Sequence, residues 1–299
     1  MEGCPFGAPL DRLPAATIHV ARFLLLLAGL TILPEGRGPP RAAGRAALLR
    51  RRRAPRPCRL SAMTDGPTRA GAAGVAAPRL LALLDYDGTM TTHECNEVAL
   101  QPFVGDEWWA LEQESYNDRM SHAECFDRQI ALIRAPRAEL IRRLLDVAEP
   151  MPGLRAFFTG LQARGGEPAI VSAGIREAIE AFWAREELPP MELFASELVG
   201  EGPEGSPPYH LEFSDALGDC PRCGPKSCKA AIVRRLRRPG DIVLVFGDGP
   251  SDLCPAREAD LVFARGHLAG RCEREGLEWR PLTDFGAVLR EVDDWLAQR

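Results

Sequence analysis

Lysine is almost absent from this sequence, which has 37 basic residues among 299 but only two lysines, Lys226 and Lys229. Any chemistry that requires a lysine must therefore use one of these two residues. Cysteine is also scarce, because nine cysteines in a chain of this length are too few for a disulfide scaffold. With 45% hydrophobic residues the chain can bury a full core without such cross-links. These features predict a soluble globular protein in which most cysteines are reduced.

Positive charge is scarce in the main part of the chain. Residues 1–80 contain 13 arginines and 4 acidic residues, whereas the rest of the chain contains 24 basic and 38 acidic residues. An acidic body lacks the positive surface that the phosphates of nucleic acid require, which excludes a nucleic-acid-binding function. A small anionic substrate would need its own local cations. The composition does not indicate an oligomeric state.

The N-terminal region lacks an apolar run long enough for a membrane span, because FLLLLAGLTIL at residues 23–33 has only eleven residues. An arginine- and alanine-rich segment follows it, with no acidic residue from Gly36 to Thr64, which is typical of a transit peptide for a chloroplast or mitochondrion. The alternatives are a secretory signal, or a disordered leader of a cytoplasmic protein that starts at Met63. In each case we expect residues 1–78 to be a leader and linker outside the folded domain.

Residues 79–299 contain three apolar runs that end in small polar or acidic residues, which is typical of buried strands in a parallel sheet. The runs are LLALLDYDGT, EPAIVSAG and DIVLVFGDG, and they start at Leu80, Glu167 and Asp241. Helical patterns lie between them. Strands that alternate with helices predict a doubly wound α/β sheet of the Rossmann-like type. Ligands bind at the carboxyl ends of the strands in such a sheet, so the polar ends of the runs should form one site.

Residues 93–150 contain no strand-like run and show helical patterning in DEWWALEQESYNDR, AECFDRQIALI and AELIRRLLDVA. The segment falls between the first strand and the helix that leads to the second. We interpret it as a helical cap inserted after the first strand, because loops at strand ends are where functional residues gather. An additional helical layer of the core is the alternative.

The three strand ends carry side chains suited to phosphoryl chemistry: Asp85 and Asp87, then Ser172, then Asp248 and Asp252. Paired carboxylates suit a hard cation such as Mg²⁺, and a carboxylate near such a cation can attack phosphorus. A single Asp-x-Asp before a glycine is weak evidence, since it could be a capped turn. The three ends together are a much stronger signal.

These residues resemble the four motifs of the haloacid dehalogenase superfamily. DYDGT at Asp85–Thr89 resembles the first motif, VSAG with Ser172 the second, Lys229 or Lys226 the third, and GDGPSD at Gly247–Asp252 the fourth. The motifs occur in the expected order. The resemblance implies a Mg²⁺-dependent phosphatase with a Rossmann-like core and an inserted helical cap of the C1 type.

The resemblance also implies a role for each motif residue. Asp85 would attack the phosphoryl group and form an aspartyl phosphate, and Asp87 would protonate the leaving oxygen and later activate water. Ser172 and Lys229 would bind the phosphoryl oxygens. We prefer Lys229 to Lys226 because it begins the pattern KAAIVRRLRR, where the helix N-terminus favours anions. The implied metal ligands are Asp85, Asp87 through its main-chain carbonyl, Asp248 and Asp252, the last of which could instead orient a metal-bound water or the lysine.

Within the superfamily, the body resembles the phosphoserine-phosphatase-like branch (subfamily IB), and in it the phosphatases of methionine salvage. The shared features include Glu94, nine residues after the nucleophile, Arg128 before an apolar pair, and ADLVFAR towards the C-terminus. They imply a small phosphorylated metabolite as substrate, in contact with Glu94, Arg128, Thr89 and Gly174. The second motif departs from the branch, with SAG where SGG is usual, and this bears on substrate identity.

Three other functions occur as alternatives on this fold. A catalytically silent phosphate-binding or interaction protein is disfavoured, because every charged residue that the mechanism needs is present. A phosphotransferase would use the same residues. Phosphonate cleavage is disfavoured because it would need a lysine in the cap, and residues 93–150 contain none.

The sequence CPRCGPKSC places Cys220, Cys223 and Cys228 at a spacing that can hold zinc. A complete structural site needs a fourth ligand. No cysteine or histidine follows at finger-like spacing, and His210 is the nearest candidate. The alternative is a loop that only shapes the surroundings of the two lysines.

Overall fold

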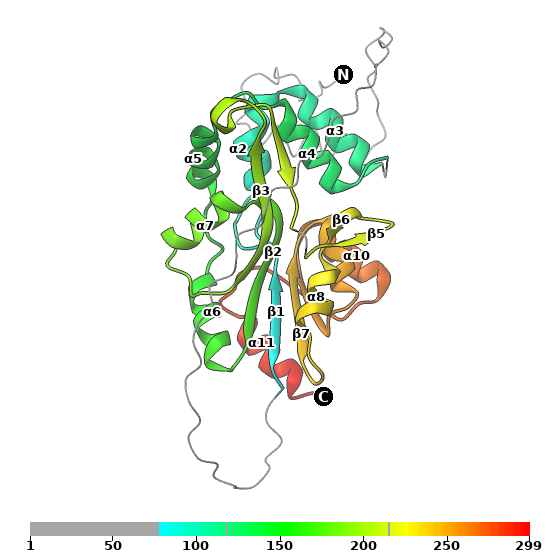
Figure 1. The fold of residues 1–299 in the computed structure, drawn as a ribbon. Helices are drawn as coiled ribbons and strands as arrows, with labels where there is room; N and C mark the ends of the chain where they lie inside the picture. Colours follow the sequence, from blue (N-terminus) through cyan, green and yellow to red (C-terminus); the bar gives the residue numbers. More distant parts are fainter. Residues whose placement is uncertain (1–77, 118, 215) are drawn as a thin grey trace, which may run out of the picture. The chain divides into compact units, whose positions relative to one another are not determined.

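Residues 78–117, 119–214 and 216–299 are described by a computed structural model, and they fall within one unit of the chain, Gly71–Arg299 (Figure 1). The predicted transit peptide and nearly all of the predicted leader and linker lie outside the described residues. None of the helices in the described part of the chain is both long and apolar enough to cross a membrane.

A seven-stranded sheet forms the centre of the fold, in the order β4-β3-β2-β1-β7-β8-β9. All neighbouring strands are parallel except β3 and β4, which are antiparallel. The chain runs outward from β1 to one side and then returns to the other side of β1 with β7, so the strand order reverses at β1. The strands are β1 (Leu80–Leu84), β2 (Glu167–Ile175), β3 (Glu192–Gly200), β4 (Tyr209–Glu212), β7 (Ile242–Gly247), β8 (Leu261–Ala264) and β9 (Trp279–Pro281).

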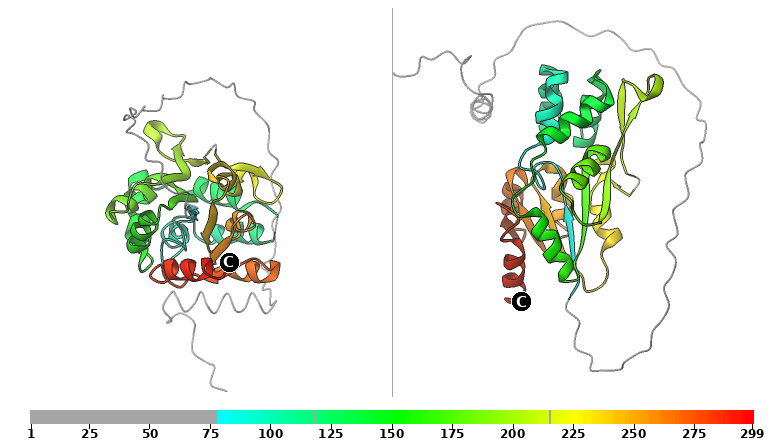
Figure 2. Two further views of the ribbon diagram at one scale, coloured as in Figure 1. Left: turned by 90° about the horizontal axis from the view of Figure 1, so that it is seen from below. Right: turned by 90° about the vertical axis from the view of Figure 1, so that its left-hand side faces the viewer.

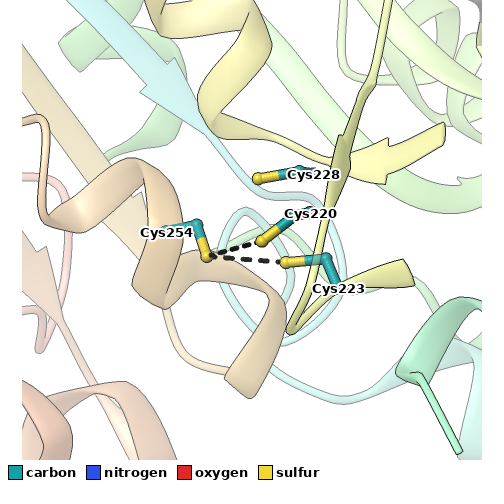
Figure 3. Close-up of side chains that lie close together, drawn as sticks. All are labelled: Cys220, Cys223, Cys228 and Cys254. Atoms are coloured by element: carbon teal, nitrogen blue, oxygen red, sulfur yellow. Dashed lines mark hydrogen bonds between the residues drawn. The ribbon is translucent and has the colours of Figure 1, made fainter. Parts of the chain in front are cut away.

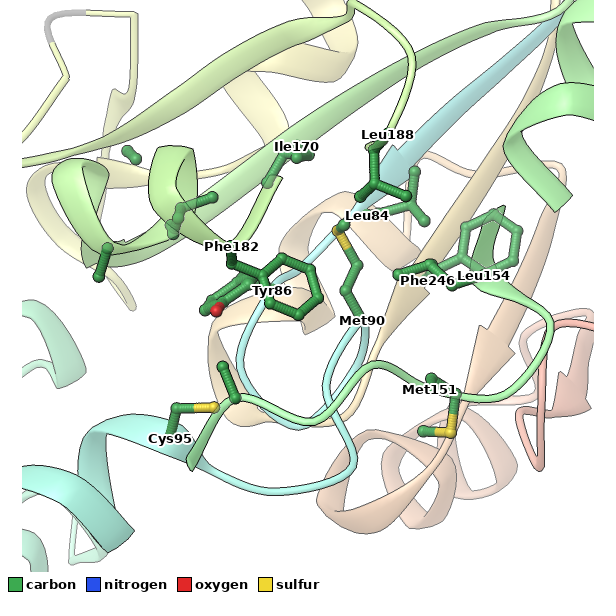
Figure 4. Packing of buried hydrophobic residues seen from close by; sticks show 14 of the residues in the cluster. Leu84, Tyr86, Met90, Cys95, Met151, Leu154, Ile170, Phe182, Leu188 and Phe246 are labelled. Atoms are coloured by element: carbon green, nitrogen blue, oxygen red, sulfur yellow. The ribbon is translucent and has the colours of Figure 1, made fainter. Parts of the chain in front are cut away.

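Helices cover both faces of this sheet. As a result, every residue of β1 is buried, and every one of them is apolar. Alternate side chains of a strand point to opposite faces. Leu80, Ala82 and Leu84 therefore join one core cluster, part of which Figure 4 shows, and Leu81 and Leu83 join another. Each fully buried leucine stabilises the fold by about 1.5–3 kcal/mol. The first cluster includes residues of α6 (Leu154–Ala163), α7 (Arg176–Arg185) and α11 (Val288–Leu296), and the second includes residues of α8 (Ala230–Leu236), α9 (Leu253–Ala256) and α10 (Gly266–Glu275).

Four helices follow β1 and lie beyond the carboxyl ends of the parallel strands (Figure 1; Figure 2, right). The chain enters and leaves this segment side by side, since Thr91 and Pro150 form an antiparallel bridge and Met151 donates its N–H to the carbonyl of Met90. We call residues 93–150 the helical insert. Its helices are α2 (Cys95–Val104), α3 (Asp106–Tyr116), α4 (His122–Leu132) and α5 (Arg137–Val147).

Two further elements touch the helical insert. The strand β4 contacts α4, where the Asp127 carboxylate accepts the N–H of Leu211 at 2.6 Å. A separate hairpin consists of β5 (Gly218–Cys220) and β6 (Gly224–Cys228) and leads directly into Lys229 and α8. These connections set the position of the insert and of Lys229 relative to the sheet.

The α/β fold class with a mostly parallel Rossmann-like sheet is confirmed, and β1, β2 and β7 are the three apolar runs of the sequence. The sequence did not reveal the strands β3, β4, β8 and β9 or the hairpin. The strands β8 and β9 have four and three residues, which is too short for a clear pattern. Pairing with neighbours, rather than local sequence, decides such strands.

Candidate active site

Lys229 connects the ends of the two central strands. Its Nζ lies 2.9 Å from a carboxylate oxygen of Asp85, which follows β1, and 2.7 Å from one of Asp252, which follows β7. The three side chains are 5%, 10% and 2% exposed, so the ion pairs are shielded from water. A buried ammonium must be paired to be stable. The fold thus brings together the predicted nucleophile, the predicted lysine and an acid of the fourth motif.

A tight turn after Asp85 brings the first motif close to the fourth. The carbonyl of Tyr86 accepts backbone N–H groups from residues 89–91. Gly88 has a φ of +64°, which favours glycine, and a Cβ there would lie 2.6 Å from a carboxylate oxygen of Asp248 and 2.8 Å from one of Glu94. Gly88 of DYDGT is therefore needed for the close approach of the first motif to Asp248 and Glu94.

The Asp87 carboxylate points to the start of α2. It accepts the N–H of Cys95 at 3.2 Å and a side-chain N–H of Asn96. The predicted acid/base residue is therefore held by the first helix of the insert. Asn96 was missed in the sequence, because a single amide nine residues after Asp87 forms no recognisable motif.

Ser172 is buried in the last part of β2, three residues before its end, and its Oγ accepts the N–H of Gly174 at 3.0 Å. A Cβ on Gly174 would lie 3.0 Å from a carboxylate oxygen of Asp87 and 3.1 Å from the Ser172 Oγ. The side chains of Asp87 and Ser172 therefore leave little room for any residue larger than glycine at position 174. The middle residue, Ala173, uses its carbonyl to accept the hydroxyl of Ser196 and lines the cavity described below.

Asp248 and Asp252 have different surroundings. Asp248 accepts the hydroxyl of Thr89 at 3.0 Å and forms a hydrogen bond with Glu94. Asp252 uses one oxygen for Lys229 and the other for the N–H groups of Asp248 and Gly249, at 3.2 and 3.1 Å. Both carboxylate oxygens of Asp252 thus already have hydrogen-bond partners, whereas Asp248 lines the cavity. Of the two roles predicted for Asp252, these contacts favour orientation of the lysine.

Negative charge accumulates in this site. Burial, followed by repulsion from Asp252, raises the pKa of Asp85 to about 7, and burial, followed by repulsion from Asp85, raises the pKa of Asp87 to about 7. The pKa of Asp248 is also well above its usual value, because of burial and the neighbouring Glu94. Oxygens of Asp85, Asp248 and Asp252 lie within 4.8 Å of one another. Such a group of oxygens fits a hard divalent cation, whose charge would relieve the repulsion.

A cavity of about 260 Å³ lies between the strand ends and the helical insert. The strand-end residues form one wall, and Trp108 of α3 and Phe126 of α4 contribute apolar surface to the opposite wall. Glu112, His122 and Arg222 add polar groups. The cavity is therefore charged on the side of the strands and partly apolar on the side of the helical insert.

The four predicted substrate contacts differ in where the structure places them. Glu94 and Gly174 line the cavity, but Thr89 is fully buried and holds Asp248 instead. Arg128 is not brought to the cavity. Its side chain is 55% exposed and pairs with Glu124 at 2.6 Å, because the inward face of α4 is taken by other residues.

Two arginines that the sequence did not single out line the cavity, Arg222 of the hairpin and Arg271 of α10. The signal for Arg222 was present, since it lies inside CPRCGPKSC before the third-motif lysine. Arg271 lies in an arginine-rich helix, where nothing in the sequence distinguishes it.

The model of the haloacid dehalogenase-like hydrolases matches residues 82–257, which is more than half of the chain and includes all four motifs. The chain belongs to this family. Several curated relatives of this chain are named phosphatases. The 2-hydroxy-3-keto-5-methylthiopentenyl-1-phosphate phosphatase of Geobacillus kaustophilus is 29% identical over 71% of this chain and 94% of its own length. The bifunctional enzyme MtnB/MtnX of Bacillus licheniformis is 28% identical over 73% of this chain, which spans about half (52%) of that enzyme.

Solved structures confirm the haloacid dehalogenase-like fold. A substrate-bound phosphoserine phosphatase has a TM-score of 0.54 and 18% identity, covering 73% of this chain and 98% of its own. A phospho-aspartyl intermediate analogue of phosphoserine phosphatase has the same TM-score and identity, with 73% and 99% covered. This member of the family is a phosphoric monoester hydrolase.

Proposed function

We propose that this chain is a Mg²⁺-dependent phosphatase that hydrolyses a small phosphomonoester through an aspartyl phosphate on Asp85. The observation that carries the proposal is the buried Asp85–Lys229–Asp252 chain of ion pairs beside a cavity that the helical insert also lines. This arrangement supports Asp85 as the nucleophile, because Lys229 beside it is a cation that can bind the phosphoryl oxygens.

In the first half of the reaction an oxygen of Asp85 attacks phosphorus and the bond from phosphorus to the alkoxide oxygen breaks. Asp87, held by Cys95 and Asn96, gives its proton to that leaving oxygen. In the second half Asp87 takes a proton from water, whose oxygen attacks phosphorus and displaces Asp85. The Ser172 hydroxyl and the Lys229 ammonium hold the phosphoryl oxygens in both halves.

Asp85 and Asp248, together with the main chain at Asp87, would hold Mg²⁺ in this site. When bound, the ion supplies positive charge that shields the phosphoryl oxygens from the surrounding carboxylates. The crowding of Asp85, Asp248 and Asp252 within 4.8 Å supports this assignment.

We propose that the helical insert acts as a cap that selects the substrate. A cavity of about 260 Å³ suits a small metabolite and excludes a folded protein surface. The relatives named for 2-hydroxy-3-keto-5-methylthiopentenyl phosphate make that compound the first candidate. The apolar surface of Trp108 and Phe126 suits its methylthioalkyl tail. Phosphoserine is the second candidate, because Glu112, Arg222 and Arg271 of the same cavity offer partners for its two further charges.

Phosphate release from a panel of phosphomonoesters, with and without Mg²⁺, tests the proposal. We expect Mg²⁺-dependent turnover, and a fall of at least about 1,000-fold in the Asp85→Asn variant with an unchanged circular dichroism spectrum. If the folded Asp85→Asn variant kept most of its activity, Asp85 would not be the nucleophile. Phosphate binding without any turnover would favour a silent phosphate-binding protein, and transfer to an added alcohol in preference to water would favour a phosphotransferase.

A further inference from the structure

Four cysteines that are distant in the sequence come together beside the active site. Cys220 ends β5, Cys223 lies in the turn before β6, Cys228 ends β6, and Cys254 lies in α9, after the fourth motif. Their sulfurs all lie within 4.8 Å of one another, with Cys254 at 3.9 Å from Cys220 and 3.5 Å from Cys223 (Figure 3). The fourth partner of CPRCGPKSC is therefore Cys254 and not His210, which lies on β4 next to Glu201.

We propose that Cys220, Cys223, Cys228 and Cys254 bind one structural Zn²⁺ ion, separate from the Mg²⁺ of the active site. Zinc bound to four thiolates at about 2.3 Å in tetrahedral geometry holds the sulfurs about 3.8 Å apart. The two sulfur distances of 3.5 and 3.9 Å are close to this value. Soft sulfur ligands also suit Zn²⁺ rather than Mg²⁺, which takes oxygen ligands.

A pair of disulfides fits the arrangement less well. A disulfide holds its two sulfurs about 2.0 Å apart and leaves the other pair at no fixed distance. Here one sulfur, that of Cys254, is close to two others at once, and the fourth is within reach of all. Zinc binding needs no oxidant, because the four thiols only release their protons to solvent as the metal binds.

The hairpin needs a cross-link of this kind. None of the eleven residues from Gly218 to Cys228 carries a large aliphatic or aromatic side chain, so the hairpin has little apolar surface of its own to bury. Its two short strands form a separate sheet. An isolated two-stranded hairpin is marginally stable in water, and small units without a core are commonly held by metals or disulfides.

Cationic and N–H groups near the sulfurs would balance the negative charge of four thiolates around one Zn²⁺. Arg222 lies in the turn between Cys220 and Cys223 and donates to the carbonyl of Pro250 at 3.2 Å. Arg257 follows Cys254 by three residues and interacts electrostatically with it. The backbone N–H of Ala230 donates to the sulfur of Cys228. Such outer contacts are common around metal-bound thiolates.

The zinc site would position the catalytic ion pair. Cys228 immediately precedes Lys229, and Cys254 follows Asp252 by two residues. The metal would therefore connect the segment that carries the lysine to the segment that carries its carboxylate partner, 2.7 Å away. The cysteines thus act on the reaction through the backbone and not by contact with substrate.

The metal content of the full chain, purified without chelator, tests the proposal directly. We expect about one Zn²⁺ per chain by mass spectrometry of the metals, retained in excess Mg²⁺. Loading with Co²⁺ should give the intense visible absorption of a tetrahedral four-thiolate site. Both measurements use the unaltered protein and no substrate, so their outcome does not depend on the proposed phosphatase activity.

Single substitutions with a matched control locate the ligands. Cys220→Ser and Cys254→Ser should each lower bound zinc to less than about one tenth of the unaltered chain, since three ligands hold the metal far more weakly. Cys272→Ala should retain it, because Cys272 is buried in α10 outside the group of four. A chain that binds neither Zn²⁺ nor Co²⁺ would overturn the proposal, whether its four thiols react freely or its mass shows the loss of two hydrogens per disulfide.

Discussion

Lys229 is the residue on which the charges of the site depend. Burial alone would lower its pKa, but attraction by Asp252 and Asp85 outweighs burial and raises it, so the ammonium stays charged. Lys226, three residues earlier, lies in the β6 strand with a φ of +48°, and its backbone N–H donates to Asp219. Only Lys229 lines the cavity.

We expect Lys229→Ala to lower kcat for p-nitrophenyl phosphate by about 100- to 1,000-fold, because a positioned charge on the phosphoryl oxygens is lost. Lys226→Asn is the matched control, since asparagine tolerates a positive φ, and we expect less than a threefold change. Steady-state kinetics on both purified variants, with circular dichroism to verify folding, checks this. A larger loss in the Lys226 variant would mean that the third motif uses the other lysine.

Glu94 and Arg128 are expected to behave differently, although the sequence suggested the same role for both. Glu94→Gln removes a carboxylate that bonds Asp248 and lines the cavity, so kcat/KM should fall about 10-fold or more for any phosphomonoester. Arg128→Ala removes only an exposed i,i+4 pair with Glu124, worth about 0.3–0.5 kcal/mol, and kcat/KM should stay within twofold. Parallel kinetics on a panel substrate and on p-nitrophenyl phosphate measures both, and an Arg128 effect confined to the panel substrate would restore its predicted substrate contact.

At the scale of elements, the amino ends of the central strands are held together far from the active site. Arg79, just before β1, donates to Asp241, just before β7, at 2.9 Å and also pairs with Glu167 at the start of β2. The Asp241 side chain is 4% exposed, whereas that of Glu167 is 52% exposed. Asp241 also accepts the N–H of Arg238 at 2.6 Å. These contacts hold β1, β2 and β7 in register with one another, and the register sets where their carboxyl ends lie in the site.

Asp241→Asn should lower the free energy of unfolding by about 1–3 kcal/mol at neutral pH, because a charged hydrogen bond in a shielded place is lost. The hydrogen bond from Arg79 lowers the pKa of Asp241 below its usual 3.8. The carboxylate therefore stabilises the fold at every pH above that value, and its contribution is lost as the pH falls through the folded-state pKa.

Urea denaturation between pH 3 and pH 8 checks this expectation. The gap between the unaltered chain and Asp241→Asn should be constant above about pH 5 and should narrow below about pH 4. The exposed Glu167→Gln is the control, with an expected loss below about 1 kcal/mol. A gap that widens in acid would contradict the assignment.

At the scale of the whole molecule, the described residues (78–117, 119–214 and 216–299) hold all of the named site residues and both core clusters. The helical insert is joined to the sheet through the paired chains at Thr91 and Pro150, and its helix α4 also contacts β4 and the β6 strand of the hairpin. The site is therefore assembled from one unit of the chain.

We expect a chain that starts at Met63 to keep the kcat/KM of the full chain within about twofold and its melting temperature within about 2 °C, because it retains every core residue of this unit. Kinetics and thermal unfolding on both forms measure this. A loss of activity or of soluble protein on trimming would mean that the first 62 residues belong to the folded domain. Organelle targeting of the leader remains a separate prediction, tested by localising the full chain and the trimmed chain in cells.

The sequence alone determined the three central strands of the sheet and the chemistry that follows them. β1, β2 and β7 are continuous apolar runs, and buried parallel strands must place Asp85, Ser172 and Asp248 at one edge. These features could be predicted because they depend on local composition and on a general rule of sheet topology. The motifs left two lysines open, and the helical pattern that begins at Lys229 favoured this residue over Lys226.

Only the tertiary structure decided which of the remaining residues meet. The direction of Arg128 depends on the packing of α4, and the contact of Asn96 with Asp87 depends on where α2 begins. Cys254 joins the other cysteines although it is separated from Cys228 by α8 and β7, because helix and strand fold back beside the hairpin. Contacts between residues so far apart in sequence leave no local pattern, since they are set by how whole elements pack.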